Sequence, residues 1–398
     1  MRPLEGTVVL DLTHVLSGPY CTMLLADLGA RTIKIEPPAG ESTRAFFASD
    51  PANSLNGMGA YFLTLNRNKE SVSIDLKQPD GLELFYALAK KTDVAINNFG
   101  PGVPRRLGID HETLARHNPR IITCSITGFG ETGPLSQRPA FDLVAQGMGG
   151  GMSITGTPET GPLRAGIPIG DLGGGLFAAI GILTALNARS LTGRGQHVDI
   201  SMLDAQISLL NYMATMHFLS GAIPHGLGNG HFLHVPYGTF QTKDAWIIIA
   251  VLSDKIWARC SEILAAPELS TDEYATQPGR WWHRERLNRQ VAEALAVRTC
   301  AEWLDIFAEQ GIPAAPVNNF AQALSDPQVR ARNMIVNVSH PLGGSVQMPG
   351  NPIKLSDTSE ERFTPPPLLG QQTETVLSGL LELHADRIAE LRRTGVVF

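Results

Sequence analysis

The first 130 residues alternate between short apolar segments and segments with helical spacing. Short segments typical of strands occupy residues 8–12, 31–36, 72–76, 94–97 and 121–126; the first is an apolar run, and residues 72–76 alternate between apolar and polar. Apolar side chains recur at helical spacing in residues 20–28, 81–90 and 111–117. This order of strand and helix predicts an α/β fold with a parallel sheet covered on both faces. Ligands of such sheets bind at the carboxyl ends of the strands.

The pattern changes after residue 128. We expect loops from 128 to 175, a long apolar helix over 176–188, a strand over 197–200 and a helix over 205–219. The apolar run 246–251 begins a second unit. We therefore predict a large Rossmann-like domain from residues 1–220 and 312–398, a linker or flap at 221–238, and a smaller α+β domain at 239–311.

Composition limits the function. With 398 residues, 43% of them hydrophobic and 18% charged, the chain can form more than one buried core. Its net charge of −6 and the lack of a Lys/Arg block argue against nucleic-acid binding. The longest apolar run, near residues 175–186, is too short for a membrane span, so we expect no membrane partner.

The four cysteines lie far apart in the sequence and form no CxxC pair. This spacing argues against a metal site and against a disulfide framework. It is typical of reduced core thiols, and we expect a cytoplasmic protein without a bound metal.

Three segments carry candidate chemistry. The first, DLTHVLSGPY at 11–20, leads from a strand into a helix N-terminus, where free N–H groups favour an anion. The alternative is a tight turn capped by Ser17. No GxGxxG follows the strand, so the dinucleotide-binding signature is absent.

The second segment is INNFGPGVPRRLG at 96–108. Asparagines at a strand end supply donors and acceptors, and glycines let a ligand approach the backbone. An arginine that enters the next helix can bind a phosphate through its guanidinium. A solvated loop with surface arginines is the alternative.

The third segment is GIPIGDLGGG at 166–175. Asp171 can be a helix cap. It can also be a carboxylate nucleophile at a helix N-terminus, with the nearby N–H groups of Gly173 and Gly174 binding an oxyanion. Three glycines exceed what capping needs, because each costs backbone entropy.

In their order and spacing, these segments resemble the class III CoA-transferase family, which includes formyl-CoA:oxalate and carnitine CoA-transferases and the α-methylacyl-CoA racemases. The resemblance covers nearly the whole chain. Besides the three segments, it is carried by LNRNKESVSIDLK, CSITGFGETGP, RPAFDLVAQ, TGRGQHVDISMLDA, VPYGTF and PPPLLGQQT. It implies an interlocked homodimer in which each chain passes through the other.

The resemblance also implies a site. The nucleophile of the transferases falls on Asp171. The positions that contact CoA fall on Leu16, Ser17, Ile74, Asp75, Leu76, Lys77, Asn98, Phe99, Gly100, Arg106 and Arg138. An arginine that contacts the nucleotide in the oxalate enzymes is replaced here by Pro37-Pro38, so Arg44 or Lys77 is expected to take its place.

The implied activity is CoA transfer from an acyl-CoA to a free carboxylic acid, through an aspartyl mixed anhydride and an aspartyl-CoA thioester. The residues of these motifs resemble those of dicarboxylate transferases more than those of oxalate transferases, which favours a short dicarboxylate with succinyl-CoA. CoA thioester is then a substrate, and no cofactor is bound permanently. An acyl-CoA racemase and a non-catalytic CoA-binding protein are the alternatives. The stretch RPAFDLVAQ lacks the racemase histidine, which favours transfer.

Overall fold

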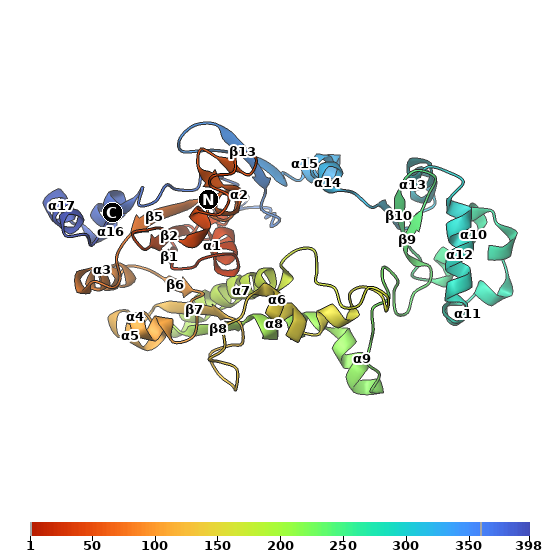
Figure 1. Ribbon diagram of the computed structural model, residues 1–398, viewed down its shortest axis with the longest axis horizontal. Helices are drawn as coiled ribbons and strands as arrows, with labels where there is room; N and C mark the ends of the chain where they lie inside the picture. Colours follow the sequence, from red (N-terminus) through yellow and green to blue (C-terminus); the bar gives the residue numbers. More distant parts are fainter. Residues whose placement is uncertain (1, 359) are drawn as a thin grey trace. The chain divides into compact units, whose positions relative to one another are not determined.

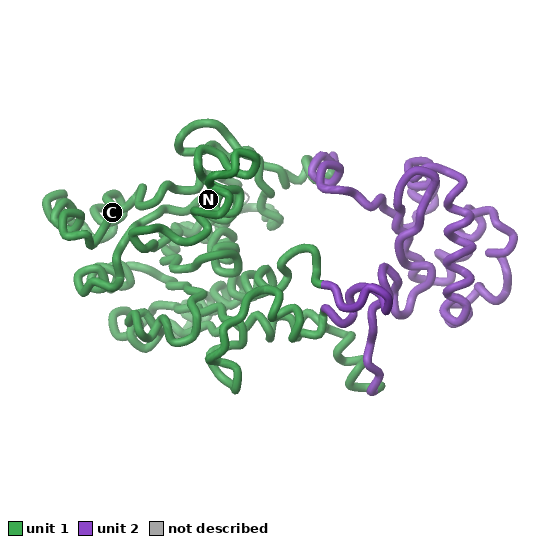
Figure 2. Tube along the Cα trace, in the orientation of Figure 1, with its two compact units in different colours: residues 1–151, 164–220, 328–398 green, residues 152–163, 221–327 purple. Residues whose placement is uncertain are grey.

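The computed structural model describes residues 2–358 and 360–398. The chain forms two compact units (Figure 2). Unit 1 contains residues 1–151, 164–220 and 328–398, and unit 2 contains residues 152–163 and 221–327.

Unit 1 is built on a six-stranded sheet in the order β5-β2-β1-β6-β7-β8. All its neighbouring strands are parallel. The strands are β1 (Val8–Asp11), β2 (Arg31–Glu36), β5 (Lys69–Ser73), β6 (Val94–Asn97), β7 (Ile122–Thr127) and β8 (His197–Ser201). The predicted α/β class with a parallel sheet is confirmed.

Helices cover both faces of this sheet (Figure 1). One face packs on α1 (Ser17–Asp27) and α7 (Ile169–Thr192), with Val9, Ile96 and Cys124 pointing into that layer. The other face packs on α3 (Pro79–Ala89), α5 (His111–His117), α16 (Thr373–Leu381) and α17 (Ala385–Arg393). The C-terminal helices therefore complete a core that the N-terminal strands begin, as the blue and red segments of Figure 1 show.

The remaining elements of unit 1 are short or lie outside the sheet. They are β3 (Ser54–Leu55), β4 (Met58–Gly59), α2 (Ala60–Leu65), α4 (Val103–Leu107), α6 (Asp142–Met148), α8 (Met202–Leu210), α9 (Tyr212–Ser220), β12 (Ile335–Ser339), β13 (Ser345–Pro349) and most of α15 (Pro327–Ala331).

The predicted strand over 72–76 is shifted in the structure. β5 ends at Ser73, and Ile74 instead forms an antiparallel bridge with Val397. The Asp75 N–H donates to the Val396 carbonyl at 2.9 Å. The alternation that suggested a longer strand is real, but its last residues pair with the C-terminus.

The predicted loop over 128–175 is wrong at its end, because α7 begins at Ile169 and takes in the glycine run. A Cβ on Gly174 would lie 3.2 Å from Met202 of α8, and one on Gly175 would lie 2.5 Å from the Ser17 carbonyl oxygen of α1. The glycines are helical because they let α7 pack closely on both neighbours. The helix expected over 205–219 is broken at Asn211, where φ is +50°.

Among the described residues, α7 is the helix long and apolar enough to cross a membrane, with a mean hydropathy of 1.7 in its 18-residue window. The same composition suits a helix that covers a sheet. Ala178, Ile182 and Ala185 of α7 are buried in the core beside α1 and β7.

Unit 2 has a three-stranded antiparallel sheet in the order β11-β10-β9. Its elements are β9 (Tyr237–Gln241), β10 (Trp246–Ala250), α10 (Asp254–Leu264), α11 (Gln277–Trp282), α12 (Arg284–Leu295), α13 (Cys300–Glu309), β11 (Ala314–Pro316) and α14 (Phe320–Ser325). The Gly228 N–H donates to Gly156 at 2.7 Å, which joins 152–163 to this unit. Residues 312–327 also belong to unit 2, since β11 pairs with β10.

Buried charges meet at the carboxyl end of β1, where Asp11 is reached by one lysine from inside β2 and one from the start of β5. Asp11 of β1, Lys34 of β2 and Lys69 of β5 are each fully buried. Lys69 Nζ lies 3.0 Å from Asp11 Oδ2, and Lys34 Nζ donates to the Thr13 carbonyl at 2.7 Å. Burial alone would raise the pKa of Asp11, but Lys69 and Lys34 hold it below its ordinary value. These contacts tie three strands together where the first loop begins.

We predict that Asp11→Ala lowers the free energy of unfolding by about 3–5 kcal/mol, because it leaves buried lysines without a counter-charge. Lys69→Met in the Asp11→Ala background should recover part of the loss, since it removes one unpaired charge. Urea unfolding of the two single variants and the double variant measures this coupling. Additive losses in the double variant would show that the pair does not interact.

Candidate active site

The loop from β1 to α1 lies at the carboxyl edge of the sheet and is fixed at its base. Asp11 Oδ1 accepts the Thr13 N–H at 2.9 Å, and Asp11 Oδ2 accepts the Thr22 hydroxyl at 2.8 Å. Lys34 holds the Thr13 carbonyl from the other side. The backbone at His14, Val15 and Leu16 then crosses the end of the strand before α1 begins.

Asn98, just past β6, reaches across to this loop. Its Oδ1 accepts the His14 N–H at 2.9 Å, and its Nδ2 donates to the His14 carbonyl at 2.7 Å. Nδ2 also lies 3.3 Å from Ser17 Oγ, and the Phe99 ring lies 5.5 Å from the His14 ring. The structure thus brings the first two predicted segments together at one edge.

Asp171 is the third residue of α7, but it does not cap that helix. Asp142 Oδ1 accepts the N–H groups of Gly170 and Asp171 at 2.8 and 3.3 Å. Gln146 Nε2 donates to Asp142 Oδ2 at 2.7 Å and holds it in place. Within the described residues, no hydrogen bond is formed by the Asp171 carboxylate. Because Asp142 satisfies the helix end, that carboxylate is left to react.

The surroundings of Asp171 make it more basic. Burial, and then the nearby Asp142 carboxylate, raise the pKa of Asp171 to about 6. Burial, followed by the charges of Asp171, Glu41 and Asp142, raises the pKa of Tyr61 to about 12, so Tyr61 faces the same group of carboxylates. A more basic carboxylate is a stronger nucleophile, and this one is still ionised at neutral pH.

Gly173 and Gly174 have a different role from the one expected. The Leu172 N–H already donates to the Pro168 carbonyl at 3.0 Å, so the amides that follow belong to the regular helical bonds of α7. They are not placed to bind an oxyanion. A Cβ on Gly173 would lie 3.3 Å from Leu209, so these glycines serve packing between α7 and α8.

The other predicted CoA positions lie on loops that follow strands of the sheet. Ile74, Asp75, Leu76 and Lys77 follow β5, Gly100 follows β6, Arg106 is on α4, and Arg138 lies between β7 and α6. Ile74 is buried, whereas Lys77, Arg106 and Arg138 are exposed. In the part of the chain that the structure describes, no hydrogen bond or ion pair joins these three cations to Asp171; they share only the edge of the sheet.

Arg44 is occupied elsewhere. Its Nε and one terminal nitrogen each lie 2.6 Å from Glu36, a second terminal nitrogen donates to Pro367, and its guanidinium stacks over Phe62 at 3.9 Å. Of the two residues expected to replace the arginine missing at Pro37, the exposed Lys77 remains available.

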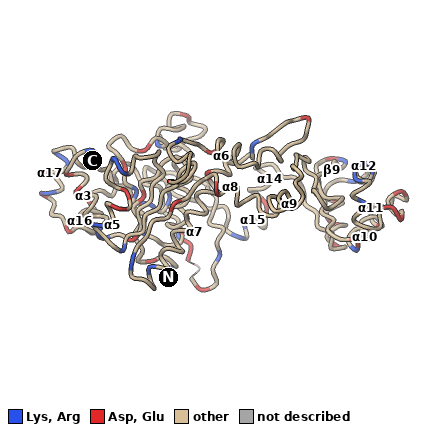
Figure 3. Tube along the Cα trace, turned by 90° about the horizontal axis from the view of Figure 1, so that it is seen from below, with Lys and Arg blue, Asp and Glu red and all other residues tan. Residues whose placement is uncertain are grey.

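Sequence reasoning missed Asp142 and Tyr61. Asp142 lies in RPAFDLVAQ, which was considered for the absence of a histidine and not for its acid. An acid at the start of a helix, 29 residues before Asp171, carries no local signal of contact. Charges are interspersed over the chain in Figure 3, so charge alone singles out neither residue.

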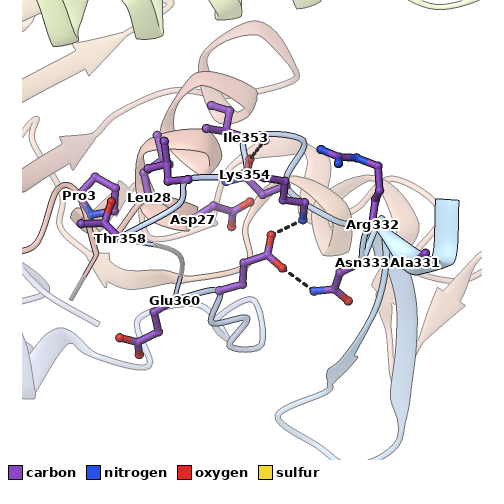
Figure 4. Close-up of a pocket in the computed structure, with 13 residues that line it drawn as sticks. Pro3, Asp27, Leu28, Ala331, Arg332, Asn333, Ile353, Lys354, Thr358 and Glu360 are labelled. Atoms are coloured by element: carbon purple, nitrogen blue, oxygen red, sulfur yellow. Dashed lines mark hydrogen bonds and ion pairs between the residues drawn. The ribbon is translucent and has the colours of Figure 1, made fainter. Parts of the chain in front are cut away.

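A separate cavity of about 280 Å³ lies at the far end of α1, beside Asp27 and Leu28 (Figure 4). Two of its carboxylates already have partners: Glu361 binds Asn333 and Lys354, and Asp27 binds Arg67, which lies outside the lining. Ser17 begins α1 and Asp27 ends it, so this cavity is not part of the candidate active site. Within the described residues, no group of three or more His, Cys, Asp or Glu could hold a metal ion.

The fold and the site together define a class of protein: an α/β protein with an unpaired aspartate in the first turn of a helix, near ligand loops at the carboxyl edge of a parallel sheet. The model of CoA-transferase family III matches residues 4–373, and the chain belongs to this family. The predicted family and enzyme class are confirmed, and the protein is a CoA-transferase.

Relatives and solved structures agree. The chain is 40% identical to the acetyl-CoA:oxalate CoA-transferase of Acetobacter aceti, over 92% of this chain and 93% of that protein. It is 36% identical to the human succinyl-CoA:glutarate CoA-transferase, over 100% of this chain and 90% of that protein. A CAIB/BAIF family protein from Brucella suis has a TM-score of 0.85 at 35% identity, covering 95% of this chain and 99% of its own.

We predict that Asp171→Asn stabilises the folded protein at neutral pH. The folded pKa of about 6 lies above the ordinary 3.8, so the folded state binds more protons between these values and loses stability as pH rises through them. At pH 7.5 the ionised Asp171 carboxylate then lowers the free energy of unfolding by about 1–3 kcal/mol, allowing for its partial exposure.

Unfolding curves of the wild type and the Asp171→Asn variant, taken from pH 4.5 to 8, measure this cost. The gain in the variant should shrink toward low pH, where the wild-type carboxyl is protonated. A variant equally stable to the wild type at every pH would contradict the raised pKa.

Proposed function

We propose that this enzyme transfers CoA from an acyl-CoA to a short dicarboxylic acid, with Asp171 as the nucleophile. The observation that carries the proposal is the free, partly buried carboxylate of Asp171 in the first turn of α7, whose cap is supplied by Asp142. A carboxylate with no structural bond of its own can form a covalent adduct without disturbing the helix.

The reaction runs through exchanges at carbonyl carbons. Asp171 attacks the donor thioester and expels CoA thiolate, which gives a mixed anhydride. The thiolate attacks the aspartyl carbonyl and releases the donor acid, leaving an aspartyl-CoA thioester. The acceptor carboxylate displaces the thiolate to form a second anhydride, and the thiolate then attacks the acceptor carbonyl. Acyl-CoA leaves and the Asp171 carboxylate is restored.

The substrate class rests on the relatives. Those named for acetyl-CoA:oxalate, succinyl-CoA:glutarate and succinyl-CoA:mesaconate transfer are 36–40% identical to this chain. Each of these acceptor acids carries two carboxylates. We take succinyl-CoA as the donor and a short dicarboxylate as the acceptor.

CoA itself is held at the carboxyl edge of the sheet. Lys77, Arg106 and Arg138 are exposed cations there and suit the diphosphate and the nucleotide. Leu16, Ser17, Phe99 and Gly100 line the path of the thioester arm toward α7. A CoA substrate enters and leaves with each turnover, so no permanently bound cofactor is part of this proposal.

The protein is proposed to act as an interlocked homodimer. Large apolar side chains are exposed on α7, α9 and the start of α6, including Ile180, Phe218, Leu219 and Phe141, the last three being 73–84% exposed. Exposed apolar surface of this extent is typical of a face that binds another chain.

The four cysteines are free and buried, which supports a cytoplasmic location.

We predict that Asp171→Asn abolishes CoA transfer, because an amide is a poor nucleophile, while CoA binding is retained. Wild-type enzyme mixed with acyl-CoA and then hydroxylamine should carry a hydroxamate at residue 171, detected by mass spectrometry of peptides. Asp142→Asn is a useful comparison, since it keeps the residue shape but weakens the cap without removing the nucleophile. Full transfer by Asp171→Asn would overturn the assignment.

We predict that Phe218→Glu combined with Leu219→Glu prevents dimer formation, because it places two charges in an apolar contact. Light scattering after size-exclusion chromatography measures the mass of the particle. Phe320→Glu is the matched control, since Phe320 is 83% exposed but belongs to unit 2. A dimeric double variant would show that α9 is outside the interface.

A further inference from the structure

Val15 has a backbone conformation that its side chain disfavours. Its φ is +64°, in the left-handed region, although it is a β-branched residue. Such a residue stays left-handed only where neighbouring contacts hold it. Val15 lies directly before Leu16 and Ser17, the residues expected to face the CoA thioester.

One side chain, that of Asn98, forms hydrogen bonds on both sides of Val15. Asn98 binds both the N–H and the carbonyl of His14, at 2.9 and 2.7 Å, and so fixes the peptide that sets φ of Val15. The second hydrogen of its Nδ2 faces Ser17 Oγ at 3.3 Å, on the other side of Val15. The amide therefore spans the left-handed residue.

These contacts use both hydrogens of the Asn98 amide. No donor is left for a phosphate or a pantetheine carbonyl of CoA. The neighbouring Asn97 differs, because its Nδ2 donates to Ser125 at 3.3 Å and its Oδ1 accepts the Phe99 N–H. Of the two asparagines, Asn98 alone touches the loop.

We propose that Asn98 is a positioning residue: it keeps Val15 left-handed and thereby presents Leu16 and Ser17 to the thioester, instead of binding CoA through its own amide. The inference rests on the proposed function for its consequence in catalysis. Its structural part concerns the free protein and stands without any substrate.

The test is rescue. Asn98→Ala removes the amide, so Val15 can leave the left-handed region, and CoA affinity should fall at least 10-fold. Val15→Asn and Val15→Gly tolerate the left-handed backbone. Each Val15 substitution is therefore made with and without Asn98→Ala. The CoA affinities of the two proteins in such a pair should differ by no more than about 3-fold. Kinetics should show the loss in KM for acyl-CoA more than in kcat.

Hydrogen exchange of residues 12–18 in the ligand-free protein gives a second readout. Asn98→Ala should speed exchange of the His14 amide at least 10-fold, because it removes the Oδ1 acceptor of that amide. Exchange at Leu16 and Ser17, which follow Val15, should also rise, and adding Val15→Asn should slow exchange at these two residues again. Asn97→Ala is the matched control. If Asn97→Ala lowers CoA affinity, neither Val15→Asn nor Val15→Gly should restore that affinity.

The outcomes separate this inference from the proposed function. If wild-type protein binds CoA and the Val15 variants fail to rescue Asn98→Ala, Asn98 contacts CoA directly and the inference is wrong. If exchange and rescue follow the pattern above but Asp171→Asn still transfers CoA, the inference stands and the catalytic assignment fails. Unchanged exchange in Asn98→Ala overturns the inference whatever the activity.

Discussion

The contact between Asp11 and Lys69, both fully buried, is the constraint on which the candidate site depends. Asp11 takes the charge of Lys69 and also binds Thr13 and Thr22, so one carboxylate joins β1, β5, the first loop and α1. A buried charge tolerates little movement, because losing a partner leaves it desolvated and unpaired. The first loop is therefore fixed at its base by electrostatics, whereas apolar contacts, which are less directional, set the layers around it.

Helix packing links the position of the first loop to that of Asp171. Gly175 of α7 lies so close to the Ser17 carbonyl that no side chain fits between them. Asp171 is one turn earlier on the same helix, so its place relative to Ser17 is set by backbone contact. Three glycines in one helix cost backbone entropy. That cost is understandable where a helix must carry a reactive group close to a ligand loop.

Local patterns in the sequence predicted most of the sheet and less of the site. The strands at 8–11 and 94–97 are mostly apolar and the strand at 31–36 alternates polar with apolar residues, and these local patterns can be recognised without knowledge of distant contacts. The start of α7 was missed because Gly173–Gly175 locally favour a turn, and only packing on α1 and α8 makes them helical. Asp142 and Tyr61 were missed because their role depends on proximity to Asp171, which no spacing along the chain encodes.

Two effects compete at Asp171. The N-terminus of α7 favours the ionised carboxylate, whereas burial and the charge of Asp142 disfavour it. Because the pKa of Asp171 is raised, burial and the charge of Asp142 outweigh the effect of the helix N-terminus. Asp142 thus has two consequences: it satisfies the free amides, and it makes its neighbour more basic. With a pKa of about 6 this carboxylate is still mostly ionised at neutral pH, and a more basic carboxylate is a stronger nucleophile. In the proposed mechanism the Asp171 carboxylate resembles the substrate acid, so the successive anhydrides would differ little in energy and transfer could run in either direction.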